Sequence, residues 1–429
     1  MKTYNQFERQ LGKMLDAFPQ LRQFGKSLYQ RFNYWYFGDR NFQVSLHPKV
    51  KLLTPDQWIG LTGAIDNIFF GYYDKSPWSK DMTKAVFHHL LNNEKTEIMI
   101  FDGAKQESQV VGKSTTWNLQ QGSMAQWLPG EQPHQLIFNV LENQRLASKI
   151  IDLDREQESI LPWPIQTLHP QKKEALTLNY KRLDRLRPEY GYAVDAENFD
   201  GNFAEEDDGI WLIDLDTAKS RLLLNLASLI NHQPRPEMVS ADHKINHIIY
   251  SPTGKRFVFM HRWIGSQGKF SRLYVADSQG NNLRLLLDDR MVSHYSWQDD
   301  NHLVTWARTN EAGDHYYLIN VETGKWQIIG EGVLDIYGDG HPSFSPDRRW
   351  IITDTYPDRA RQQHLLLFAV ETGKLIEVGK FLEPLAFNGP NRCDLHPRWS
   401  PDGNLISIDS SHEGKRKTFF LDISAIINR

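Results

Sequence analysis

Several features that would narrow the class of this protein are scarce or absent. Its 429 residues include one cysteine, Cys393, which excludes a disulfide framework and favours a reducing compartment, so we expect a cytoplasmic protein. The formal net charge of −4 argues against nucleic acid as a partner. No run approaches the ~18 apolar residues that a membrane-spanning helix needs. The N-terminus lacks the uninterrupted apolar segment of a secretory signal.

What the chain does contain is ordinary for a soluble globular protein, with 40% hydrophobic and 24% charged residues. Aromatic residues are plentiful: 13 Trp, 16 Tyr and 22 Phe. They suit a large β-core better than a sugar-binding surface, although both remain open at this point.

A short turn phrase recurs along the chain. It is typically an aromatic residue followed by Ser, Pro, Asp and Gly, the residues that tight turns use. Its copies are Trp78-Ser-Lys-Asp81, Trp127-Leu-Pro-Gly130, Leu168-His-Pro-Gln171, Tyr250-Ser-Pro-Thr-Gly254, Trp297-Gln-Asp-Asp300, Phe344-Ser-Pro-Asp347 and Trp399-Ser-Pro-Asp-Gly403. The second residue of each copy lies at position 79, 128, 169, 251, 298, 345 or 400, so successive copies are 49, 41, 82, 47, 47 and 55 residues apart.

Each turn leads into a strand-like apolar run, such as RFVFMH or LISIDS, and most units then carry a hairpin signal such as NVETGK. A repeat of about 40–50 residues with four short strands is typical of a propeller blade. Seven copies therefore predict an all-β fold, a seven-bladed β-propeller of four-stranded blades spanning residues 43–429.

Two irregularities refine this prediction. Only 29 residues follow position 400, too few for a whole blade. We therefore expect an N-terminal strand within residues 43–54 to close the last blade, since a ring must satisfy its edge strands. The 82-residue spacing predicts an insertion near residues 181–208.

Residues 1–42 precede the repeat and form a predicted helical extension. Apolar residues recur there at three- or four-residue steps, interrupted by Pro19. They are Phe7, Leu11, Met14, Phe18, Leu21 and Phe24, and basic residues occupy the other faces. Two hypotheses follow: a cap packed on the propeller or on a partner such as a biosynthetic complex, or a basic amphipathic segment resting on a membrane surface.

Histidines recur at one phase of the repeat. Four residues before the turn position, the last four blades carry His247, His294, His341 and His396. Equivalent positions of a propeller converge around its axis, so we expect these imidazoles to share one site. Imidazoles with carboxylates bind divalent metals, and a neutral imidazole is a general base near pH 7.

Other polar residues are predicted near that arc. Tyr72 and Tyr73 open the first blade, and further candidates end inner strands or flank His396. These are Arg262, Asp354, Tyr356, Arg392, Asp394 and Arg398. In the insertion, Arg185 and Arg187 are interleaved with tyrosines, which favours binding of an anionic polymer, although the acidic run from Asp195 to Asp208 could neutralise them.

The repeated Ser-Pro-Asp-Gly blades resemble TolB-like propellers. The phrases Arg392-x-x-x-His396-Pro and Asp339-Gly-His341-Pro resemble oligogalacturonate lyases, which are seven-bladed. The motifs cover roughly residues 240–429, and the architecture alone extends the resemblance to residues 60–240. The chain is also similar to propellers of bacterial surface-polysaccharide gene clusters.

The lyase resemblance implies a divalent metal, with manganese preferred over calcium, and no organic cofactor. It implies His341 and His396 as metal ligands and Arg392 as a substrate-binding arginine, with His294 as the best candidate for the base. The chain departs from the family pattern twice. Cys393 replaces a glutamine ligand, and Arg398 replaces a second histidine. Either the metal is lost, or Asp394 and another histidine complete its site.

Three hypotheses for function follow. The first is a lyase that cleaves a uronate-containing oligo- or polysaccharide by β-elimination. In it, His294 or His247 abstracts a proton, Arg392, Arg262 and Arg398 neutralise the carboxylate, and Tyr72, Tyr73 or Tyr356 protonates the leaving oxygen. The second is a non-catalytic propeller that binds a glycan or a partner in surface-polysaccharide biosynthesis. The third is a glycosyl hydrolase or transferase that uses paired carboxylates among Asp74, Asp354, Asp409 and Glu413.

Overall fold

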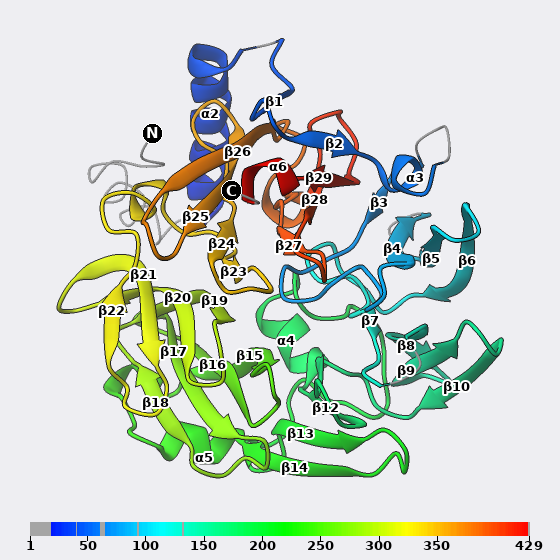
Figure 1. The fold of residues 1–429 in the computed structure, drawn as a ribbon. Helices are drawn as coiled ribbons and strands as arrows, with labels where there is room; N and C mark the ends of the chain where they lie inside the picture. The colour runs from blue at the N-terminus through cyan, green and yellow to red at the C-terminus, as the bar shows by residue number, and fades with distance from the viewer. Residues whose placement is uncertain (1–18, 40, 61–64, 92–93, 131–132, 428–429) are drawn as a thin grey trace.

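The computed structural model describes residues 19–39, 41–60, 65–91, 94–130 and 133–427. Seven antiparallel sheets surround a common centre as the blades of a propeller (Figure 1). The predicted all-β, seven-bladed fold is therefore confirmed. None of the described helices is long and apolar enough to cross a membrane.

Each blade begins with its innermost strand, and the strands then follow one another outward. The first blade holds β3 (Ile68–Phe69), β4 (Lys84–Leu90), β5 (Thr96–Asp102) and β6 (Glu107–Ser114). The second holds β7 (Gln126–Trp127), β8 (Gln135–Glu142), β9 (Arg145–Asp152) and β10 (Gln157–Leu161). The third holds β11 (Thr167–Leu168), β12 (Glu174–Thr177), β13 (Gly209–Asp214) and β14 (Ser220–Asn225).

The remaining blades repeat this order. The fourth holds β15 (Asp242–Tyr250), β16 (Arg256–Gly265), β17 (Gly268–Asp277) and β18 (Arg284–Leu287). The fifth holds β19 (Met291–Trp297), β20 (His302–Thr309), β21 (Gly313–Asn320) and β22 (Trp326–Ile328). The sixth holds β23 (Ser343–Phe344), β24 (Trp350–Thr353), β25 (Gln362–Ala369) and β26 (Leu375–Leu382), and the seventh β27 (Arg398–Trp399), β28 (Leu405–Ser410) and β29 (Lys417–Asp422).

Two N-terminal strands close the ring. β2 (Lys51–Leu53) pairs with β29 as the fourth strand of the last blade, with Leu52 opposite Leu421. This confirms the expected closure from residues 43–54. The sequence did not reveal that β1 (Val44–Leu46) pairs antiparallel with β26 as a fifth strand of the sixth blade. β1 and β2 therefore connect the outer edges of two neighbouring blades, the sixth and the seventh.

The tryptophan of the turn phrase fastens the second, fifth and seventh blades to the blade before each. Three tryptophans show it directly, because each indole N–H donates to a backbone carbonyl of the preceding blade. The bonds are Trp127 to Pro77 (2.8 Å), Trp297 to Ile249 (3.3 Å) and Trp399 to Ser343 (3.1 Å). The core otherwise consists of apolar side chains stacked between adjacent sheets.

Helices lie at the chain ends and in connections. They are α2 (Pro19–Phe37), α3 (Pro55–Trp58), α4 (Tyr180–Leu186), α5 (Leu226–Asn231) and α6 (Ser424–Ile427), with 3₁₀ turns at Pro236–Met238, Asp335–Tyr337 and Gly389–Asn391. α2 agrees with the predicted helical extension, and Pro19 stands in its first described turn, where proline is tolerated. The predicted apolar positions Phe7, Leu11, Met14 and Phe18 lie outside the described residues.

The insertion between β12 and β13 begins with α4. The Asn179 side chain caps this helix by accepting from the backbone N–H groups of Lys181 and Arg182. A buried ion pair joins Arg182 to Asp208, the residue just before β13. These contacts hold α4 near the middle of the ring (Figure 1).

Candidate functional site

The four histidines of the repeat converge on one site. Irregularities of the backbone help to direct their side chains toward it. In β15 the pairing register shifts between Asn246 and Ile249, and in β19 it shifts between Val292 and Tyr295. His247 and His294 lie in these bulges, which redirect side chains next to many functional sites. His247 and His396 also adopt positive φ, 56° and 44°, uncommon for a residue with a Cβ.

Tyr72 forms the hub of the arc. The ring is 3% exposed and contacts all four imidazoles. Its centroid lies 4.9 Å from that of His247, 6.4 Å from His294, 6.0 Å from His341 and 5.0 Å from His396. Adjacent histidines are also close, with centroids 4.1 Å apart for His294 and His341 and 4.3 Å apart for His341 and His396.

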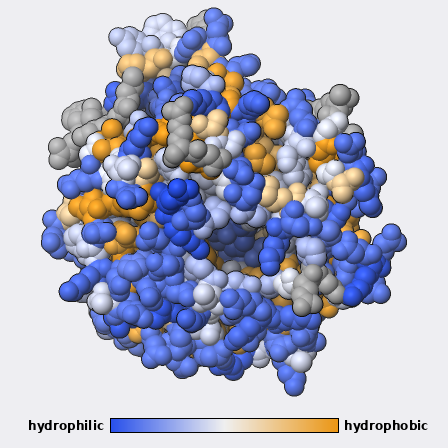
Figure 2. Space-filling view, viewed as in Figure 1, coloured by the Kyte–Doolittle hydropathy of each residue, from blue (hydrophilic) through white to orange (hydrophobic). Residues whose placement is uncertain are grey.

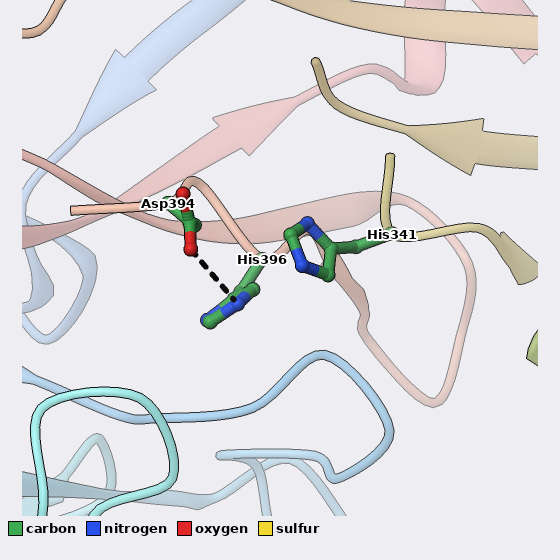
Figure 3. A group of neighbouring side chains, drawn as sticks. All are labelled: His341, Asp394 and His396. Atoms are coloured by element: carbon green, nitrogen blue, oxygen red, sulfur yellow. Dashed lines mark ion pairs between the residues drawn. The ribbon is translucent and has the colours of Figure 1, made fainter. Parts of the chain in front are cut away.

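A potential metal centre lies within this cluster. One ligand atom each from His341, His396 and Asp394 falls within 4.8 Å of the others. Figure 3 shows the three side chains turned toward one another from the loops that precede β23 and β27, with Asp394 Oδ2 3.9 Å from His396 Nε2. His341 Nε2, His396 Nε2 and Asp394 Oδ1 are buried without hydrogen-bond partners. Such orphaned acceptor atoms are what a bound cation would satisfy.

The other nitrogen of each imidazole is occupied. His341 Nδ1 lies 2.8 Å from Asp354, and His396 Nδ1 lies 2.8 Å from the backbone oxygen of Gly71. Because a carbonyl only accepts, His396 Nδ1 carries the hydrogen and Nε2 keeps its lone pair. This pairing with a carboxylate or carbonyl orients histidine ligands in many metal sites.

The electrostatic surroundings of the two histidines differ. Burial and the neighbouring His341 hold the pKa of His396 well below its usual range, so it is neutral. Burial also lowers the pKa of His341, but the carboxylate of Asp354 and then that of Asp394 outweigh it, and the net pKa is raised. Negative charge beside His341 therefore favours a cation there, whether a proton or a metal.

His294 has the properties of a neutral base. Its Nδ1 lies 3.1 Å from Asp339 and 3.2 Å from the Ser293 hydroxyl. Burial, and then the charge of His341, lowers the pKa of His294. Asp339 therefore orients the ring with Nδ1 protonated, and Nε2 can accept a proton.

His247 is placed differently. Both of its ring nitrogens are buried without hydrogen-bond partners, although Nε2 lies 3.7 Å from Asp74. Burial lowers its pKa to about 4. Asp74 is itself paired with Lys75 at 2.5 Å. His247 thus lies beside an occupied carboxylate rather than among the metal-ligand atoms.

Guanidinium groups gather around the same tyrosine hub. Arg187 lies over the ring of Tyr190 at 4.2 Å, and the charges of Arg187, Arg262 and Arg392 interact with the tyrosines at the centre. Burial, and then the charge of Arg187, lowers the pKa of Arg262 to about 10. Arg392 is paired with Asp394 at 2.7 Å, but among the described residues neither Arg187 nor Arg262 has a carboxylate partner.

The insertion closes over the arc. Tyr190 packs edge-on against Tyr72 at 5.9 Å, and its hydroxyl accepts a hydrogen bond from Arg392 at 3.2 Å. The cluster is therefore almost completely buried, and Figure 2 shows one face of the ring with a recess near its middle. Two cavities are lined by residues of the turn phrases. One of about 480 Å³ is lined by Trp127 and His169, among others, and one of about 260 Å³ by Trp297.

Three of the predicted site residues already use polar groups in bonds within the protein. Arg398 is buried and donates to the carbonyls of Gly71 and Tyr72 and to Asp409. Tyr73 contacts the four imidazoles, but its hydroxyl is bonded to the backbone of Tyr295. Arg185 is exposed and paired with Asp242.

The two departures from the lyase pattern do not supply ligand atoms. Burial raises the pKa of the Cys393 thiol to about 12, so it is not a thiolate. Arg398 is a cation paired with Asp409. Asp394 takes the third place in the ligand group instead.

Sequence analysis missed the roles of Tyr190 and Asp339. Tyr190 belongs to the tyrosine-rich insertion, where only the arginines drew attention. Asp339 stands inside the Asp-Gly-His-Pro phrase, and its spacing of two before His341 was the available signal. Its partner, however, is His294 of the previous blade.

Comparison with known proteins bears on the fold. No protein-family model and no curated protein sequence matches the chain. A solved oligogalacturonate lyase in complex with manganese matches with a TM-score of 0.60 and 14% identity, over 90% of this chain and 95% of that chain. The oligogalacturonate lyase from Vibrio parahaemolyticus matches with a TM-score of 0.59 and 11% identity, over 89% and 97%.

The chain is similar to oligogalacturonate lyases in fold. TolB from Acinetobacter baumannii also matches, with a TM-score of 0.39 and 14% identity over 80% of each chain. Oligogalacturonate lyases, one of the groups that the sequence resembled, are thus among its structural neighbours. At these identities the similarity establishes the propeller and not the reaction.

Proposed function

We propose that this protein is a carbohydrate-active propeller, and specifically a lyase that cleaves a uronate-containing oligo- or polysaccharide by β-elimination. One observation carries the proposal. Unpartnered ligand atoms of His341, His396 and Asp394 share a buried cluster with arginines that lack carboxylate partners. The structural neighbour described as a manganese complex of oligogalacturonate lyase supports it.

β-Elimination from a uronate has two requirements. The C5 proton must be removed while negative charge develops on the adjacent carboxylate, and the C4–O bond must break as the C4–C5 double bond forms. Arg187 and Arg262 would bind the carboxylate and stabilise that charge, as guanidinium groups do for planar anions. A divalent cation held by His341, His396 and Asp394 would add further positive charge at the same carboxylate.

His294 is the proposed base. Its neutral imidazole takes the C5 proton at Nε2, and Asp339 stabilises the resulting imidazolium through Nδ1. His247 is less suited, because no carboxylate of the described residues lies within hydrogen-bond distance of either of its nitrogens.

Tyrosine supplies the proton for the leaving oxygen. Burial raises the pKa of Tyr72 and of Tyr356 well above the ordinary value, so both hydroxyls are protonated. Tyr72 contacts the base and both histidine ligands, which makes it the preferred acid. Since Tyr190 packs against Tyr72, substrate entry requires the segment around Tyr190 to move.

The hydrolase alternative receives less support, because its carboxylates are occupied. Asp354 accepts from the backbone N–H groups of His341 and His396 as well as from the His341 ring. Asp409 accepts from Phe70, Gly71 and Arg398. Two carboxylates free to act as acid and base are therefore not found among these residues.

The test is ultraviolet absorbance of the protein mixed with a panel of uronate-containing oligosaccharides, with and without Mn²⁺. The proposal expects absorbance of a 4,5-unsaturated product that depends on the metal. His294→Gln should lower the rate by about 10²–10⁴-fold, the usual contribution of a general base, without lowering the melting temperature. His302→Gln, a surface imidazole paired with Asp299, is the matched control.

Three outcomes would count against this assignment. Full turnover by a folded His294→Gln variant would remove His294 as the base. Hydrolysed products without unsaturation would indicate a hydrolase. Tight binding of one glycan, recovered unchanged, would establish the non-catalytic binding propeller in place of the lyase.

A further inference from the structure

Helix α2 is mounted on the propeller with its apolar side outward. Its inward side carries Tyr29, Gln30 and Asn33, and Asn33 is 6% exposed. Its outward side carries Leu28, Phe32, Trp35 and Tyr36, which are 51%, 58%, 68% and 66% exposed. A surface helix of a globular protein normally buries its apolar stripe, so this orientation indicates that something else covers that stripe.

The inward contacts fix the helix in this orientation. Tyr29 and Asn33 face Pro357 and Arg361 across a small cavity, and the Arg359 guanidinium lies 5.9 Å from the ring of Phe37. Figure 1 shows α2 beside β25 and β26, with one end beyond the rim of the ring. The outward residues are spaced by four, three and one, which places them on one face of the helix.

We propose that this face, formed by Leu28, Phe32, Trp35 and Tyr36, binds an anionic lipid surface. The charge of the helix favours this occupant. α2 carries Arg22, Lys26 and Arg31 and no acidic residue, although the whole chain has a net charge of −4. A local excess of basic residues on an otherwise acidic protein is complementary to anionic headgroups.

The composition of the apolar face supports the same occupant. Trp and Tyr have an apolar ring with a polar edge, and such residues concentrate at the boundary between headgroups and acyl chains. Phe32 and Tyr36 stack at 6.3 Å, so the rings form one continuous surface. Aromatic anchors with neighbouring cations are the pattern of helices that lie in the membrane interface.

Lipid binding through α2 would also bear on the position of the histidine cluster. The loop on which α2 rests, residues 357–361, follows Tyr356 directly, and Arg31 lines a cavity with Leu385 and Asn388 in the loop that leads to Asp394. A protein docked through α2 would therefore be attached through the loops that lead to the histidine cluster. The lipid-binding proposal itself does not rest on the lyase reaction.

The experiment is vesicle flotation of the full chain. Vesicles of phosphatidylcholine with phosphatidylglycerol should bind the protein at least about tenfold more tightly than phosphatidylcholine alone, and added salt should weaken the binding. The double variant Phe32→Glu, Trp35→Glu should lose at least about tenfold in affinity. Val239→Glu, at a position 74% exposed outside α2, is the matched control and should bind as the wild type does.

Other occupants give distinguishable results. If the wild type sediments as a dimer and the double variant as a monomer, without vesicle binding by either, a second copy of the chain covers this face and the proposal is overturned. Equal flotation of the wild type and the double variant would also overturn it. Both variants must keep the wild-type melting temperature for the comparison to hold.

Discussion

At the scale of single residues, hydrogen bonding decides which nitrogen of each histidine is available. Asp354, Asp339 and the Gly71 carbonyl engage the Nδ1 atoms of His341, His294 and His396 in turn. The Nε2 atoms of His341 and His396 are left without partners among the described residues. Asp354 and Asp339 are therefore positioning residues with different expected effects, one on metal binding and one on the base.

Asp354→Asn should weaken metal binding. Loss of the carboxylate beside His341 Nδ1 removes the charge that orients this histidine, and such changes typically cost about 10–100-fold in metal affinity. Titration calorimetry with Mn²⁺ measures the change.

Asp339→Asn provides the matched control, because it removes a carboxylate from His294 and not from a ligand. It should leave the Mn²⁺ affinity unchanged and lower kcat. Equal loss of metal affinity in both variants would indicate a general structural effect rather than orientation of a ligand.

At the scale of elements, the innermost strands β15 and β19 each have two roles. The bulge of each strand directs a histidine toward the axis, and its last residue packs toward the neighbouring blade. In β19 these are His294 and Trp297, three residues apart. The same short strand thus connects the candidate site to the stability of the ring.

Trp399→Phe should destabilise the protein by about 1 kcal/mol, the usual net value of one hydrogen bond. The phenyl ring keeps part of the packing between the last two blades, but the bond from the indole N–H to the Ser343 carbonyl is lost. Urea denaturation measures the difference.

Trp326→Phe is the appropriate comparison. Trp326 is half-buried in the outer strand β22, and its indole makes no hydrogen bond to the described residues. A larger loss of stability at position 326 than at 399 would contradict the proposed fastening of blades by tryptophan.

At the scale of the whole molecule, the closed ring buries imidazoles that cannot take up a proton. His88 lies inside the first blade, where its Nε2 accepts from the backbone N–H of Ser123 at 2.9 Å. Burial lowers its pKa to about 4, and burial lowers the pKa of His412 to about 4 as well. Both groups are neutral in the folded protein at pH values where an unfolded histidine is protonated.

Stability should therefore fall as the pH falls from about 6.5 to about 4. Over this window the unfolded state binds more protons than the folded state, and each of these histidines contributes up to about 3 kcal/mol of the loss. Above the upper pH of this window, the buried neutral histidines contribute their full stabilisation. Urea denaturation across the window measures the slope, which His88→Gln should reduce by about 1.4 kcal/mol per pH unit. A wild-type stability independent of pH in this window would refute the prediction.

The sequence alone was enough for the fold. The repeated turn phrase, its spacing and the apolar runs after it are local signals, because a tight turn and a strand depend on neighbouring residues. The shortage of residues after position 400 even located the closing strand, β2. The phase of His247, His294, His341 and His396 was visible for the same reason.

Tertiary structure decided the rest, because the site is made of contacts between distant parts of the chain. His396 Nδ1 bonds to Gly71, 325 residues earlier, and Arg392 reaches Tyr190 across 202 residues. No local pattern reports which nitrogen is engaged or that the insertion covers the arc. Sequence spacing placed these residues around one axis, whereas packing determined which of their polar atoms were left without partners.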